Sequence, residues 1–113
     1  DAATIGVKVE LTGELPKQEE LYHIFVIAMR ESLTNSVRHA DATELSAVVT
    51  QNDGSVSLRV TNNGKPPKSP AQPKGGLLNV HRHIVNLGGS MEIQWSPIFV
   101  LTITIPTEKE AIE

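Results

Sequence analysis

The 113-residue sequence is 39% hydrophobic and 4% aromatic, and this length suits one compact domain with a single core. Ten lysines and arginines against 13 aspartates and glutamates give a formal net charge of -3, without the basic excess expected of a nucleic-acid binder. The absence of cysteine excludes disulfides and thiolate metal sites.

The ends of the sequence predict that it is one domain of a longer protein. It opens with Asp1-Ala2-Ala3, without a starting methionine or a signal-peptide pattern. No apolar run approaches the roughly 20 residues that span a bilayer. We therefore expect residues 1–113 to form a single domain with a core at about 5–106, and any membrane segment or sensor to lie in other parts of the protein.

The first part of the chain predicts a strand and a long helix. Apolar and polar residues alternate from 5 to 12, which is typical of a half-buried strand. Pro16 and the acidic pair Glu19 and Glu20 favour a helix start. Residues 17–40 contain no glycine or proline, and their broad apolar stripe predicts a largely buried helix.

Two hairpins are expected in the rest of the chain. Alternating segments at 45–49 and 56–60 flank Asp53-Gly54, a strong hairpin signal. Alternating segments at 91–95 and 99–105 flank Ser96-Pro97.

A loop and a second helix lie between these hairpins. Residues 62–75 hold four prolines and predict irregular structure. Residues 76–87 have one apolar face and end at Gly88-Gly89, a typical helix stop. Strands with one apolar face and two helices to cover it predict a two-layer α+β sandwich.

The long helix carries a polar seam near its end. Glu31, Asn35, Arg38 and His39 follow the spacing that lines one helix face. An asparagine oxygen can ligate Mg²⁺, the two basic side chains can meet phosphate oxygens, and a glutamate can orient or deprotonate a nucleophile. The alternative is a solvated surface stripe, since short polar spacings recur by chance.

Two further segments stand at element boundaries. Asn62-Asn63-Gly64 follows a predicted strand, and its simplest interpretation is a turn. Lys74-Gly75-Gly76-Leu77 opens the second helix, where glycines let backbone N–H groups approach an anion.

In this order, the three segments resemble the GHKL ATPase superfamily. Residues 31–40 look like its N box, and most like that of sensor histidine kinases whose N box ends in Arg-His-Ala. Residues 62–66 occupy the place of the G1 box, residues 75–77 that of the G2 box, and residues 62–75 that of the ATP lid. The resemblance covers about residues 5–106.

The resemblance implies the Bergerat fold, a mixed, mostly antiparallel sheet with helices on one face and ATP held between the helices and the lid. It implies a catalytic role for Glu31 and Mg²⁺ binding by Asn35. The residues that it places around ATP are Asn35, Arg38, His39, Asn62, Gly64, Gly75, Gly76 and Leu77.

The resemblance also implies a reaction and partners. Such domains transfer the γ-phosphoryl group of ATP to a histidine on a separate dimerisation domain, in a two-component system with a response regulator. No such domain fits in this chain, and His23, His81 and His83 are expected to be ordinary helix or surface residues. The implied location is the cytoplasmic part of a bacterial protein whose membrane anchor lies in other segments.

Several positions depart from the family's motifs. Asn62 stands where the G1 box usually has an aspartate that accepts a hydrogen bond from adenine, Pro66 replaces a G1 glycine, and Lys74 a G2 glycine. A neutral acceptor is weaker by about 1 kcal/mol, which lowers affinity several-fold. These changes leave open a degenerate pseudo-ATPase that acts as an interaction module, and a serine kinase of the anti-sigma-factor type.

Overall fold

The computed structural model describes residues 8–39, 43–64, 76–94 and 97–107, and for residues 35–39 it describes the backbone alone. The elements in chain order are β1 (Lys8–Thr12), α1 (Glu19–His39), β2 (Glu44–Asn52), β3 (Ser55–Asn62), α2 (Gly76–Asn86), β4 (Ser90–Gln94) and β5 (Val100–Pro106). No helix within these ranges is both long and apolar enough to span a membrane.

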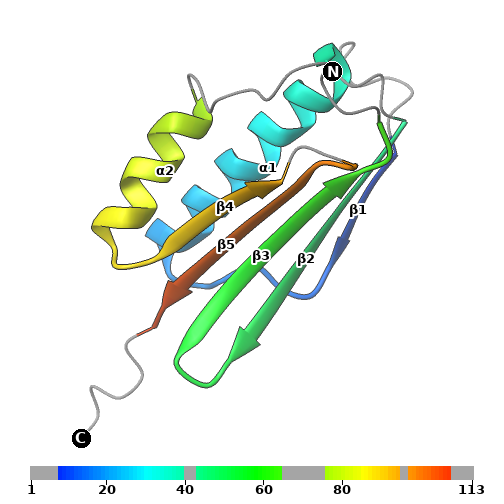
Figure 1. Cartoon of the computed structure of the whole chain (residues 1–113). Coiled ribbons are helices and arrows are strands. Elements are labelled where there is room, and N and C mark those ends of the chain that lie inside the picture. The colour runs from blue at the N-terminus through cyan, green and yellow to red at the C-terminus, as the bar shows by residue number, and fades with distance from the viewer. Residues whose placement is uncertain (1–7, 40–42, 65–75, 95–96, 108–113) are drawn as a thin grey trace, which may run out of the picture.

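The strands form one mixed, mostly antiparallel sheet. Its order is β1-β2-β3-β5-β4. β1 runs parallel to β2, and the other neighbouring strands are antiparallel. Both helices lie on the same face of the sheet (Figure 1). The predicted two-layer α+β sandwich is therefore confirmed.

One hydrophobic core fills the space between the sheet and the helices. The inward face of β3 contributes Val56, Leu58 and Val60, each at most 2% exposed. α1 contributes one buried stripe rather than its whole surface: Leu21, Ile24, Phe25 and Ala28. α2 contributes Leu77, Val80 and Ile84. Burying one large apolar side chain stabilises a fold by about 1.5–3 kcal/mol, so this stripe pattern holds both helices in place.

β1 was predicted to be a half-buried strand, but it is exposed. All five of its residues are exposed, and Val9 and Leu11 keep 50% and 46% of their surface open to solvent. Their neighbours in β2, Leu45 and Ala47, are almost fully buried. α1 packs over β2 and β3, whereas β1 is the edge strand beyond it. The alternation was correct, but neither α1 nor α2 covers the apolar face of β1. Residues 5–7 of the prediction lie outside the described residues.

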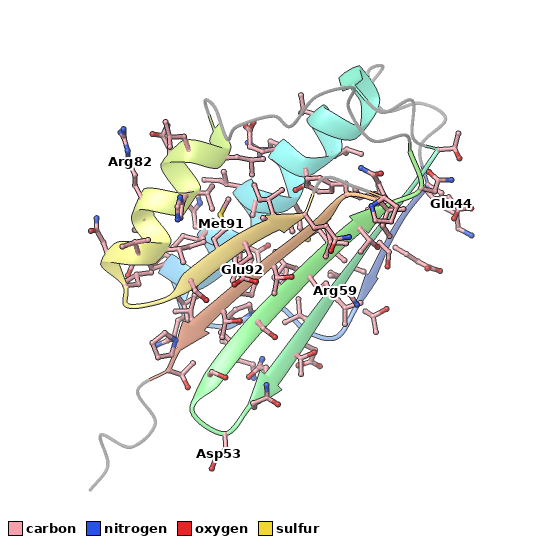
Figure 2. The ribbon with its side chains drawn as sticks, viewed as in Figure 1. Glu44, Asp53, Arg59, Arg82, Met91 and Glu92 are labelled. Atoms are coloured by element: carbon pink, nitrogen blue, oxygen red, sulfur yellow. The ribbon has the colours of Figure 1, made fainter. Side chains whose placement is uncertain are left out.

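The hairpins fall where the sequence places them. Asn52 pairs with Ser55 across Asp53-Gly54, and Figure 2 shows Asp53 at the tip of this hairpin and Glu44 at the opposite end of β2. β4 and β5 form the second antiparallel pair. Its predicted turn includes residue 96, which lies outside the described residues.

The end of α2 is closed by a Schellman motif. Gly88 has a φ of +82°, which only glycine adopts without strain. Its N–H donates to the Val85 carbonyl at 3.0 Å, and the Gly89 N–H donates to the Ile84 carbonyl at 2.9 Å. The helix therefore ends at the glycine pair that the sequence indicated.

We expect Gly88→Ala to destabilise the domain, because a β-carbon in the left-handed region costs about 1–2 kcal/mol. Gly88→Asn is the matched control, since asparagine tolerates this conformation better. Urea denaturation followed by circular dichroism measures both. Equal stability of the two variants would show that the backbone at Gly88 is not held in the left-handed region.

Candidate functional site

The described parts of the three motif segments lie at the same end of the molecule. α1 ends, β3 ends and α2 begins at this end of the sandwich, which is also where β2 begins (Figure 1). Glu44, labelled in Figure 2, marks it. The segments are far apart in sequence, and the antiparallel packing of α1 and α2 brings them together.

Glu31 and Gly76 make the contact between the two helices here. The Glu31 side chain is half-buried and lies against Gly76, the first residue of α2. A β-carbon at Gly76 would overlap the Cγ, Cδ and Oε2 atoms of Glu31. The N-terminus of a helix carries a partial positive charge, so the carboxylate lies in a favourable field. A larger residue at this position would therefore force the Glu31 side chain to move.

A second contact aligns the helices at their other ends. Glu20, in the first turn of α1, has its Oε2 atom 3.0 Å from Nε2 of His83, in the last turn of α2. Both side chains are about half exposed. His83 was expected at the surface, and this is confirmed. Its partner was not predictable, because helix packing and not sequence spacing brings Glu20 to it.

Asn62 is a buried polar residue at the end of β3. It pairs with Leu45 on the helix-facing side of the sheet and is 7% exposed. Its Oδ1 atom accepts a hydrogen bond from the Gly64 N–H at 2.8 Å. Ser32 of α1 is the other buried polar residue in the described part of the chain. The turn predicted after this strand is therefore built by the Asn62 side chain itself.

Asn63 has a different role, which sequence reasoning missed. Its Oδ1 atom accepts hydrogen bonds from the Thr43 and Glu44 N–H groups at 2.9 and 3.0 Å. Its Nδ2 atom donates to Thr43 Oγ1 at 2.9 Å, and its backbone N–H donates to the Glu44 carbonyl at 3.2 Å. Asn63 thereby ties the end of β3 to the start of β2. Turn propensity alone was the available signal, and it does not distinguish this asparagine from Asn62.

Other predicted site residues are described less fully. Gly75 and the lid residues from 65 to 75 lie outside the described residues, as do the side chains of Asn35, Arg38 and His39, so their roles stay predictions. The Leu77 side chain is 2% exposed and lies in the core. Only its backbone is therefore left to make the predicted contact with a ligand. The described residues contain no group of three or more histidines, aspartates or glutamates that could hold a metal.

Two hollows border the described surface. One of about 190 Å³ includes Asn62 and Asn63 with residues of β1 and β2. One of about 840 Å³ lies at the opposite end, between the start of α1 and the β2–β3 hairpin. The larger hollow contains none of the predicted site residues, and the polar seam therefore does not belong to it.

Solved structures that superpose on this chain include domains of histidine kinases. The ATP-binding domain of PrrB from Mycobacterium tuberculosis superposes with a TM-score of 0.68 at 21% identity, covering 96% of this chain and 87% of that one. The histidine kinase domain of the blue-light activated kinase EL346 from Erythrobacter litoralis gives a TM-score of 0.70 at 18% identity, covering 90% and 52%. No family model matches the sequence. The chain has the fold of a histidine-kinase ATPase domain, and the resemblance predicted from its motifs is confirmed.

One known protein is also similar to this chain in sequence. The nitrate/nitrite sensor protein NarX of Escherichia coli K12 is 37% identical over 67 residues. This alignment covers 56% of the chain but 11% of NarX, so the chain spans about a tenth of the length of this relative.

We expect Asn63→Ala to lower the free energy of unfolding by about 0.5–1.5 kcal/mol, because two exposed backbone N–H groups exchange their protein acceptor for water. Asn63→Asp keeps that acceptor and loses only the donor to Thr43 Oγ1, so its loss should be smaller. Thermal and urea denaturation measure both. Equal losses of stability in the two variants would contradict the proposed role of the Asn63 Oδ1 atom as the acceptor that matters most.

The Glu31–Gly76 contact predicts a coupling between the two positions. Gly76→Ala displaces the carboxylate, whereas in a Glu31→Ala background the same substitution meets no obstacle. We expect a coupling free energy of at least about 0.5 kcal/mol in a double-mutant cycle of unfolding. An additive cycle would show that the two residues do not touch in solution.

Proposed function

We propose that this chain is the ATP-binding catalytic domain of a sensor histidine kinase, which binds ATP with Mg²⁺ and transfers its γ-phosphoryl group to a histidine on a separate dimerisation domain. The observation that carries the proposal is the Glu31 carboxylate against the first residue of α2, at the end where the described parts of the three motif segments lie. The fold shared with histidine-kinase ATPase domains supports the same reaction.

The start of α2 is the proposed phosphate-binding element. Helix N-termini bind anions through free backbone N–H groups and the helix dipole. Gly76 has no side chain at this N-terminus, and the Glu31 side chain lies against it. Gly75 precedes it as the second glycine, and the Leu77 backbone continues the turn. Polyphosphate is the chemistry that this arrangement suits.

The end of α1 is the proposed catalytic and metal-binding element. Asn35 lies one helical turn after Glu31 and would contribute an oxygen to Mg²⁺. Bound Mg²⁺ supplies charge neutralisation and orientation of the β- and γ-phosphates. Arg38 and His39 would contact phosphate oxygens, and Glu31 would orient or deprotonate the attacking imidazole. Their spacing along the sequence follows one face of a helix, and we propose that one nucleotide contacts them all.

The partners follow from the reaction. The acceptor histidine belongs to a dimerisation and phosphotransfer domain, and a response regulator takes the phosphoryl group from it. NarX is by its name a sensor protein, and we propose an analogous arrangement here: a cytoplasmic catalytic domain in a bacterial protein that reaches the membrane through other segments.

A second candidate function has its own support. Asn62, Pro66 and Lys74 depart from the family's base- and phosphate-binding motifs, which favours a pseudo-ATPase that keeps the fold as an interaction module. A ligand that binds only the native state must raise the melting temperature. A melting temperature that is unchanged at millimolar ATP and Mg²⁺ supports the module, and a rise supports the kinase.

We expect Asn35→Ala to lower Mg²⁺-dependent ATP affinity at least about tenfold, or about 1.4 kcal/mol, because the substitution removes the proposed metal ligand. Isothermal titration calorimetry with and without Mg²⁺ measures this. Asn86→Ala, at the exposed far end of α2, is the control and should bind as the unaltered chain does. Absence of binding by the unaltered chain at millimolar ATP would refute the kinase proposal.

A further inference from the structure

β1 directs one row of backbone hydrogen-bonding groups away from the sheet. It is the first strand in the sheet order, with β2 on its inner side. The Lys8 N–H donates to the Thr43 carbonyl at 2.8 Å, so the backbone of Lys8 faces β2. Because the direction of these groups alternates along a strand, the N–H and C=O groups of Val9 and Leu11 face outward. A strand edge of this kind is a template for pairing with another strand.

The side chains of β1 are apolar on one face of the sheet and mostly charged on the other. Val9 and Leu11 lie on the helix-facing side and are about half exposed, because α1 packs over β2 and β3. Lys8 and Glu10 point to the opposite face and are exposed. A second strand beside β1 would therefore cover apolar surface that α1 and α2 do not cover.

The charges of β1 make the strand complementary to a second copy of itself. Two copies related by a two-fold axis perpendicular to the sheet pair as antiparallel strands, with side chains of the same direction opposite each other. If the axis passes through Val9, each Lys8 stands opposite Glu10 of the second copy. The two Val9 residues then form a hydrogen-bonded pair, and each Lys8–Glu10 pair is of the non-hydrogen-bonded type, in which side chains are closest.

Other registers of β1, and the other edge of the sheet, lack this complementarity. An axis at Lys8 or at Glu10 places two like charges directly opposite each other, which is destabilising. An axis at Leu11 places Glu10 opposite the neutral Thr12. β4, the strand at the other edge, carries Glu92 as its one charged residue, so two β4 strands form no ion pair in any register. Charge therefore favours one edge and one register.

We propose that two copies of this chain associate through their β1 strands, antiparallel and with the two-fold axis at Val9, so that two Lys8–Glu10 ion pairs form between the copies. The pairing joins the two five-stranded sheets into one continuous sheet. The contact is small and its ion pairs are exposed, so the association is weak and becomes measurable at high protein concentration. It is independent of the proposed function, because it uses none of the proposed ATP-binding residues.

Sedimentation equilibrium of the 113-residue chain up to millimolar concentration measures the dimer dissociation constant. We expect Lys8→Glu and Glu10→Lys each to raise it at least about tenfold, because each creates two pairs of like charges. The combined Lys8→Glu/Glu10→Lys variant restores both ion pairs in reverse, and should dimerise within about threefold of the unaltered chain. Glu92→Lys is the matched control: it makes the same charge reversal on the other edge strand (Figure 2) and should leave the constant unchanged.

Val9→Pro tests the backbone part of the contact. Its N–H faces outward, so proline removes a donor from the free edge and keeps the ladder between β1 and β2. We expect this variant to stay monomeric. Circular dichroism at low concentration checks that each variant folds. Glu10 is the cleaner position for a charge reversal, because its neighbour in β2 is Ser46, whereas Lys8 has Glu44 beside it.

The outcomes decide for or against this contact. A chain that stays monomeric at millimolar concentration overturns the proposal, and so does a dimer that neither single charge reversal weakens or that the combined variant does not restore. Should the variants not fold, the unaltered chain still gives an answer. Salt screens exposed ion pairs, so its dimer must weaken as salt is added, and a dimer that salt leaves unchanged or strengthens overturns the proposal. Binding of ATP is measured separately and is affected by none of these results.

Discussion

The contact between Glu31 and Gly76 is the constraint on which the site depends. The two helices must lie side by side to bury the apolar face of the sheet, since α1 packs over β2 and β3, and α2 over β4. At the end where α2 begins, no side chain on α2 separates them, so a carboxylate of α1 reaches the start of α2. The Glu20–His83 pair aligns their other ends. The packing of α1 against α2 thus both stabilises the fold and places the Glu31 carboxylate at the N-terminus of α2.

Asn62 and Asn63 are neighbours at the end of β3, but the geometry of the strand directs their side chains to opposite faces of the sheet. Successive side chains along a strand point to opposite faces of the sheet. Asn62 is buried on the side of the helices, and Asn63 is exposed and bonded to the start of β2. One asparagine therefore stabilises the position at which the other stands. This tie holds the end of β3 against the start of β2.

The sequence predicts the parts of this structure that depend on local pattern. The period of the apolar residues predicted both helices and both hairpins, Asp53-Gly54 marked the first turn, and Gly88 marked the end of α2. The exposure of Val9 and Leu11 was not predictable, because alternation shows that one strand face is apolar but not that a helix covers it. The Glu31–Gly76 contact and the separate roles of Asn62 and Asn63 arise from tertiary packing, which spacing along the chain does not contain.

The three positions that depart from the GHKL motifs belong to one stretch of the sequence. Asn62, Pro66 and Lys74 all lie between the end of β3 and the start of α2, whereas the polar seam lies on α1. α1 is held by the burial of Ile24, Phe25 and Ala28, each at most 2% exposed. Changes in the loop therefore do not move Glu31, since the core and not the loop positions it. Glu31 therefore rests on a different element from the segment that joins β3 to α2.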